Sequence, residues 1–109
     1  MSVKTIDQQH RATFEGIRHV DENGSEFWLA RPLAKVLDYS EYRHFLPVVE
    51  RAREACRNSG HLVSDHFEDI LEMVEIGSGA RRELPDVRLS RYACYLIVQN
   101  ADPNKPVIA

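Results

Sequence analysis

An Asn-Gly pair at positions 23 and 24 constrains the fold of this chain more than any other local feature. Both residue types tolerate the positive φ angles of a tight hairpin turn, so the pair is a strong hairpin signal. Short alternating segments lie on either side of it, at 17–20 and 25–29. The pattern predicts an antiparallel hairpin whose second strand places Trp28 on one face and Phe27 on the other.

Three later segments have the apolar spacing of helices. The first begins at Pro32, which suits the first turn of a helix. The second is predicted over 47–57, after a separate short turn at 41–45, because a proline inside a helix removes a hydrogen bond. The third is predicted over 91–100, with the serine before it as its cap.

A second hairpin is predicted between the last two helices. Its strands are expected at 72–76 and 82–89, joined by the glycines at 77 and 79. Pro85 weakens or bulges the second strand, because it has no N–H to donate. A single helical turn is expected to begin near Asp65, ahead of the first strand.

These elements predict one α+β domain in which small antiparallel hairpins pack against three or four helices. A chain of 109 residues is long enough for one modest core. Residues 1–14 are expected to form a loose arm or short helix, and 15–109 the domain. The predicted core residues are Trp28, Leu33, Leu37, Phe45, Val49, Leu89, Leu96 and Ile97.

Hydropathy and cysteine usage are typical of a cytoplasmic protein. No apolar run approaches the roughly 20 residues that a membrane span needs, and the N-terminus lacks the pattern of a signal peptide. Cys56 and Cys94 belong to no CxxC pair, and both lie among apolar neighbours. We expect two reduced, buried thiols.

Charge is distributed unevenly along the chain. The formal net charge is −3, which argues against a simple electrostatic nucleic-acid binder. The segment 61–76 holds five acidic residues and no lysine or arginine. Arginine outnumbers lysine eleven to three in the whole chain, and arginine is favoured for planar contacts with phosphate, carboxylate or aromatic groups. A surface of salt-bridged helices is the alternative explanation.

Tyrosine and arginine occur together at two predicted helix starts, and two arginines follow each other at the predicted turn near 78–82. This pattern suits a surface that binds a phosphate backbone or a protein partner. The candidate nucleic-acid-binding residues are Tyr42, Arg43, His44, Arg81, Arg82 and Arg91. Tyr42 is expected to face solvent and Tyr39 to be buried. The two helices between 32 and 57 also have the spacing of a helix-turn-helix, a spacing that is common in domains that do not bind DNA.

No motif for catalysis, a metal or a cofactor is found. His61 and His66 lie near acidic residues, but their spacing puts the two rings on different sides of a helix. The glycines around Ser78 lack the Gly-Lys-Ser/Thr of a phosphate-binding loop. We therefore expect neither an enzyme nor a metal or cofactor site.

Several longer segments carry a family resemblance. The residues concerned are 39–45, 54–56, 58–61, 65–68, 73–74, 76–78 and 89–96. From about residue 15 to its end the chain resembles the Bro-N domain, in the form found in the bacterial DNA-damage-inducible protein D family. The resemblance implies DNA binding, a role in the SOS response, restraint of a RecA-type recombinase, and a longer protein of which this is the N-terminal part.

Two hypotheses follow for function. The first is a non-enzymatic nucleic-acid-binding module that acts in the SOS response or in DNA transactions. The second is a protein-interaction module that binds a recombinase or another basic partner through Asp65, Glu68, Asp69 and Glu72. DNA affinity that falls steeply with salt would favour the first. Strand preference and oligomeric state stay open.

Overall fold

The computed structural model describes residues 13–103. It confirms the α+β prediction. The elements, in chain order, are β1 (His19–Val20), β2 (Glu26–Leu29), α2 (Ala30–Val36), α3 (Tyr42–Asn58), the 3₁₀ turn η1 (Val63–Asp65), β3 (Phe67–Glu75), β4 (Arg81–Leu89) and α4 (Arg91–Asn100). The loose N-terminal segment or short helix predicted for 1–14 falls almost entirely outside the described residues.

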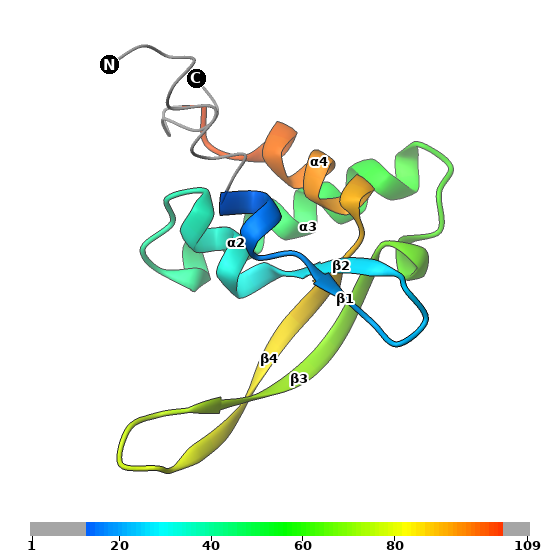
Figure 1. Cartoon of the computed structure of the whole chain (residues 1–109). Coiled ribbons are helices and arrows are strands. Elements are labelled where there is room, and N and C mark those ends of the chain that lie inside the picture. Colours follow the sequence, from blue (N-terminus) through cyan, green and yellow to red (C-terminus); the bar gives the residue numbers. More distant parts are fainter. Residues whose placement is uncertain (1–12, 104–109) are drawn as a thin grey trace.

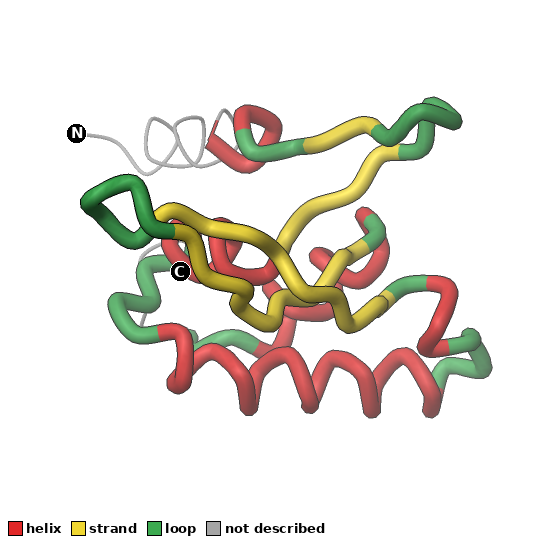
Figure 2. Tube along the Cα trace, turned by 90° about the horizontal axis from the view of Figure 1, so that it is seen from below, coloured by secondary structure: helices red, strands yellow, loops and turns green. Residues whose placement is uncertain are grey.

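The four strands form one antiparallel sheet in the order β1-β2-β4-β3. Helix α3 runs along one side of this sheet (Figure 2). Strands β3 and β4 extend far beyond the rest of the sheet (Figure 1). The reason is the short pairing between β2 and β4, which involves only Leu89 and Arg88 of β4. We call residues 69–87 the arm and the remaining described residues the body.

The first hairpin is confirmed, with a wider turn than the sequence predicted. Its loop closes through a hydrogen bond from Asp21 N to Ser25 O of 2.9 Å. Of the loop residues 21–25, only Gly24 has a positive φ, of 82°. The carboxylate of Asp21 accepts hydrogen bonds from the backbone N–H groups of Asn23 and Ser25, and these bonds hold the loop. Hydrogen bonds to the Asp21 side chain therefore stabilise a longer loop in place of the predicted two-residue turn.

Helix α3 corrects the prediction of a separate turn at 41–45. It begins at Tyr42 and continues through Pro47. The proline removes only the bond to the carbonyl of Arg43, which lies in the exposed first turn. Phe45 and Val49 are buried on either side of it, and this burial outweighs the lost bond.

Strand β3 corrects the helical turn predicted near Asp65. The turn is the short η1, and the strand begins at Phe67 rather than Glu72. Phe67 and Leu71 fit a helical period, but Phe67 is buried whereas Leu71 is 67% exposed. Pairing with β4 along nine residues decided the conformation here, because each strand residue gains a ladder partner.

The core lies between the helices and the base of the sheet. All eight residues predicted for it are buried, as are Ala52, Val87 and Ala93. Trp28 is fully buried; its indole N–H donates to Phe14 O at 2.9 Å. Both cysteines are free and buried, as predicted, and burial raises the pKa of Cys94 to about 12. Within residues 13–103 no helix has the length and hydropathy to cross a membrane.

Candidate nucleic-acid interface

The predicted site residues fall in three places. Tyr42, Arg43 and His44 form the first turn of α3. Arg81 and Arg82 begin β4, at the end of the arm, and Arg91 begins α4. Since β4 has nine residues at about 3.3 Å each, roughly 30 Å separates Arg91 from the arm pair. These cations therefore do not all meet on one surface.

Arg91 is engaged inside the body. Its guanidinium makes a bidentate contact with Glu26, at 2.8 and 3.0 Å, and contacts Glu15 at 3.3 Å. It also lies 5.0 Å from the centre of the Trp28 ring system. Hydrogen bonds from Arg91 and then Arg18 lower the pKa of Glu26 to about 2. Arg91 thus ties the start of α4 to the first hairpin.

Arg43 and His44 have weaker ties. Both contact the carboxylate of Glu41, Arg43 at 2.9 Å and His44 at 3.5 Å. The side chain of Arg43 is 75% exposed. Exposed ion pairs of this kind contribute little stability, so a phosphate can replace Glu41 at small cost.

The two tyrosines differ in burial, as predicted, but Tyr42 does not face solvent freely. Tyr39 is buried, and its hydroxyl accepts a hydrogen bond from Asp102 N. Tyr42 is half-buried, with the guanidinium of Arg31 4.1 Å above its ring. Burial raises the pKa of Tyr42 to about 12. Arg31 is held over the ring by the hydrogen bond from its Nε to Pro85 O, at 2.8 Å.

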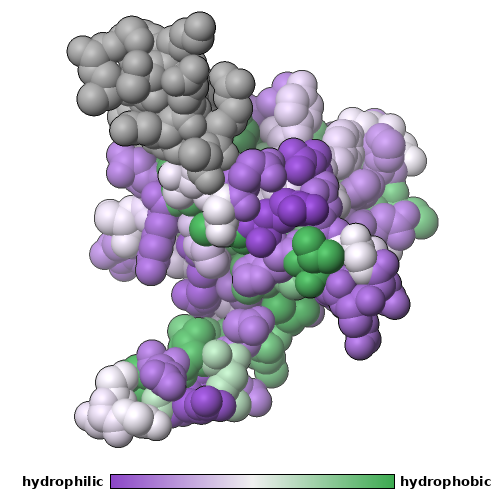
Figure 3. All heavy atoms as spheres, in the orientation of Figure 1, coloured by the Kyte–Doolittle hydropathy of each residue, from purple (hydrophilic) through white to green (hydrophobic). Residues whose placement is uncertain are grey.

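A groove of about 580 Å³ lies between α2 and the arm. Tyr42 lines it, and Arg31 and Lys35 of α2 lie on one wall. The opposite wall is apolar and acidic; its arm residues are Glu72, Val74, Glu75, Ile76, Leu84 and Asp86. Figure 3 shows hydrophobic surface along the arm near the body.

Unpaired cations lie in this groove and at the end of the arm. Among residues 13–103, Lys35, Arg81 and Arg82 have neither an ion pair nor a side-chain hydrogen bond. Arg82 lies opposite Val74, which lines the groove, and so extends its arm wall toward the tip. The arrangement offers free cations beside an aromatic ring, which suits a phosphate backbone and its bases.

Sequence reasoning missed Arg31 and Lys35. Their spacing of four residues puts them on one side of a helix, and this was the available signal. The sequence did not show which cations are neutralised within the fold, because the partners of Arg91 and Arg88 are distant in sequence.

The predicted acidic residues do not share one face. Asp69 is paired with Arg53 of α3 at 2.7 Å. Glu68 lies 4.0 Å from Arg88, and Glu72 lines the groove. Asp65 is in η1, beside a different hollow. Strand alternation separates Asp69 from Glu68 and Glu72.

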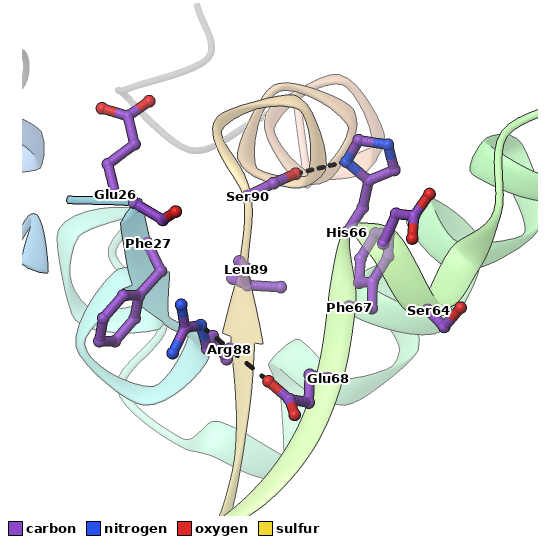
Figure 4. A pocket seen from close by; sticks show the side chains of 11 residues that line it. Glu26, Phe27, Ser64, His66, Phe67, Glu68, Arg88, Leu89 and Ser90 are labelled. Atoms are coloured by element: carbon purple, nitrogen blue, oxygen red, sulfur yellow. Dashed lines mark hydrogen bonds and ion pairs between the residues drawn. The ribbon is translucent and has the colours of Figure 1, made fainter. Parts of the chain in front are cut away.

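That second hollow, of about 260 Å³, is lined by η1 and by residues of β2, β3 and β4 (Figure 4). His66 Nδ1 lies 2.7 Å from Ser90 Oγ, which accepts a hydrogen bond from Ala93 N. The rings of His61 and His66 both pack against Tyr92. The serine is thereby engaged as the helix cap. Within 13–103 no three His, Cys, Asp or Glu residues are grouped to hold a metal.

Comparison with known proteins gives one family and one relative. The family described as BRO family, N-terminal domain (Bro-N) matches residues 16–109. DNA damage-inducible protein D of Escherichia coli (strain K12) is 63% identical over 101 residues. These cover 93% of this chain and 37% of the relative, so the chain spans little more than a third of that protein's length. No solved structure matches the chain.

Proposed function

The chain belongs to the Bro-N family, and from this premise we propose that it is a DNA-binding domain of a DNA-damage response. The observation that carries the proposal is a set of unpaired cations: Lys35 and Arg82 beside the groove, and Arg81 next to Arg82 on the other face of the arm. Side chains without an internal partner exchange only water and counterions for phosphate, so they contribute most to binding.

The two walls of the groove would make different contacts with DNA. Lys35 and Arg82 are placed to contact phosphates from two sides, while Arg43 exchanges Glu41 for phosphate at the start of α3. The half-buried ring of Tyr42, held by Arg31, offers an edge for base or sugar contacts. Glu72 and Glu75 disfavour a deep approach of the backbone between these walls.

The role of the whole protein is a further part of the proposal. We place this domain in the bacterial SOS response, in the cytoplasm, where it acts without catalysis and restrains a RecA-type recombinase. The name of the relative supports the damage response. Since the chain covers 37% of that relative, the remaining length is available for contacts with other proteins.

The test is a titration of labelled single-stranded and double-stranded oligonucleotides by fluorescence anisotropy at two salt concentrations. Replacing Arg81 and Arg82 together with alanine should weaken binding for all sequences alike and reduce the salt slope by roughly two. Lys35→Ala should reduce it by about one. Arg57→Ala is the matched control, because Arg57 is paired with Glu54 at the far end of α3. Equal affinity in wild type and the double variant would refute the proposal.

A second candidate function is protein interaction through the acidic strand. It is favoured by Glu72 and Glu75, which have no ion pair among residues 13–103. Changing Glu68, Asp69 and Glu72 to their amides should leave DNA affinity unchanged or raise it, because negative charge near the phosphates is removed. The same variant should lose binding to a basic protein partner, here a purified RecA-type recombinase. Loss of DNA binding in this variant would argue against both roles.

A further inference from the structure

The outer edges of β3 and β4, the two strands of the arm, differ in how far their backbone groups are already hydrogen-bonded. In an antiparallel ladder, successive residues direct their N–H and C=O groups alternately toward the partner strand and away from it. Hydrogen bonds from Ile76 N to Ala80 O and from Ser90 N to His66 O, both 3.0 Å, fix the phase. The even-numbered residues of β3 and β4 thus direct their N–H and C=O groups toward the partner strand. Odd-numbered residues direct their backbone groups outward.

The outer edge of β4 is closed over the half nearer the body. Leu89 and Arg88 pair with β2. Val87 N donates to the carboxylate of Asp86 at 2.8 Å. Pro85 has no N–H, and its carbonyl accepts a hydrogen bond from Arg31 Nε at 2.8 Å. From 85 to 89 this edge therefore offers little to another strand.

The outer edge of β3 is open. Strand β3 is the last strand of the sheet, and within residues 13–103 it pairs only with β4. Asp69, Leu71, Met73 and Glu75 direct their backbone groups to this side. Leu71 and Met73 are 67% and 52% exposed. The strand has no proline, lysine or bulge to protect this edge; its charged residues are all carboxylates, which repel an acidic strand but attract a basic one.

We propose that the outer edge of β3 is a β-addition site for an extended, basic segment of another protein. The charge of the strand selects this occupant, because β3 has four carboxylates and no cation. Lysine or arginine at alternate positions of an added strand would lie on the face of Glu68 and Glu72, with the apolar residues between them against Leu71 and Met73 on the other face. A second copy of β3 would bring four more carboxylates to the same edge, which disfavours self-pairing.

This inference deepens the second candidate function and rests on it alone. The DNA contacts proposed above involve Lys35 and the arginines of the arm, and the added strand involves the backbone of β3. The two proposals can therefore fail separately.

The decisive comparison uses two proline variants at one ladder position. Met73 and Glu83 lie directly opposite each other, and both direct their N–H groups outward. Met73→Pro removes a donor from the β3 edge, and Glu83→Pro removes one from the β4 edge. Both substitutions place the same strain in the same ribbon, so each controls for the other. Circular dichroism and thermal melting should give the same result for both.

The probe is a fluorescein-labelled short peptide of alternating arginine and valine, titrated by anisotropy. Glu83→Pro should bind it nearly as well as wild type, since it loses one exposed carboxylate but no β3 donor. Met73→Pro should bind about tenfold more weakly, since one edge hydrogen bond is lost. A glutamate-valine peptide should not bind. The variant Glu68→Gln with Glu72→Gln should bind the basic peptide more weakly and with less salt dependence. Equal peptide binding by both proline variants would overturn the proposal.

Amide hydrogen exchange of the wild type gives an independent measurement. The basic peptide should slow exchange at Leu71 and Met73, whose amides face outward. Slowing by an oligonucleotide instead of the peptide would overturn the proposal in favour of nucleic acid. A wild-type dimer in sedimentation velocity that Met73→Pro abolishes would overturn it in favour of a second copy. The Arg81 and Arg82 double variant should keep peptide binding even where it loses DNA binding.

Discussion

The body fully buries residues such as Trp28 and Ile97, whereas the arm leaves Leu71 and Met73 more than half exposed. The body is held by apolar burial from three helices and the base of the sheet. The distal arm is held mainly by the ladder between two strands. A two-stranded ribbon without a packed face is only marginally stable by itself, so the body must anchor the arm at its base. The arm can therefore vary in sequence at small cost in stability, and it has a surface free for binding.

The sharpest test of this difference compares one large apolar residue from each region. Ile97→Ala should lower the free energy of unfolding by about 2–5 kcal/mol, because the residue is fully buried in the core. Leu71→Ala should change it by less than about 0.5 kcal/mol, since the side chain is mostly exposed. Urea unfolding followed by circular dichroism measures both. Equal losses would mean that the arm is part of the same packed unit.

Asp86 joins the two regions at the base of the arm. It is 4% exposed, and its carboxylate accepts hydrogen bonds from Arg31 N of α2 and from Val87 N. Asp86→Ala should lower the free energy of unfolding by about 1–3 kcal/mol, because two backbone donors lose their acceptor. Asp86→Asn keeps an acceptor oxygen and should lose less. Glu83→Ala, an exposed acid on the same strand, is the control, and an equal loss there would contradict the role of Asp86.

Ser90 lies between the end of β4 and the start of α4. Its hydroxyl accepts from Ala93 N at 3.0 Å and lies 2.7 Å from His66 Nδ1. Ser90→Ala should lower the free energy of unfolding by about 1 kcal/mol, the usual value for a lost helix cap. Ser90→Thr keeps the hydroxyl and should stay near wild type in thermal melts. An unchanged melting temperature in the alanine variant would show that the cap contributes nothing here.

Acid should weaken the contact between β2 and α4 in the body. Arg91 and Arg18 hold the pKa of Glu26 near 2, against 4.5 for the free residue. A lowered pKa contributes stability that is fully present above pH 4.5 and is lost as the pH falls from 4.5 toward 2. Melting temperatures of Glu26→Gln should therefore fall less than those of wild type over this range. The same acid sensitivity in both proteins would assign it to other carboxylates, such as Asp21 beside Arg88.

Much of the body followed from the sequence. The apolar residues of the core have helical or alternating spacing, and burial of such residues is the largest local constraint on a fold. The Asn-Gly pair predicted the first hairpin, and Ser90 predicted the start of α4. The proline at position 47 led to a wrong prediction of the helix start, because its effect on a helix depends on how much apolar surface its neighbours bury.

The arm and the site were decided by tertiary structure. The segment 67–75 fits both a helical and a strand period, and only the pairing with β4 selects the strand. Six candidate site residues were identified from their types, but the structure determines which cations are free. Arg91 is held by Glu26, 65 positions away in the chain, while Lys35 and Arg82 have no such partner among the described residues. Local patterns determine burial and turns, whereas the neutralisation of a charge depends on residues that meet only when the chain folds.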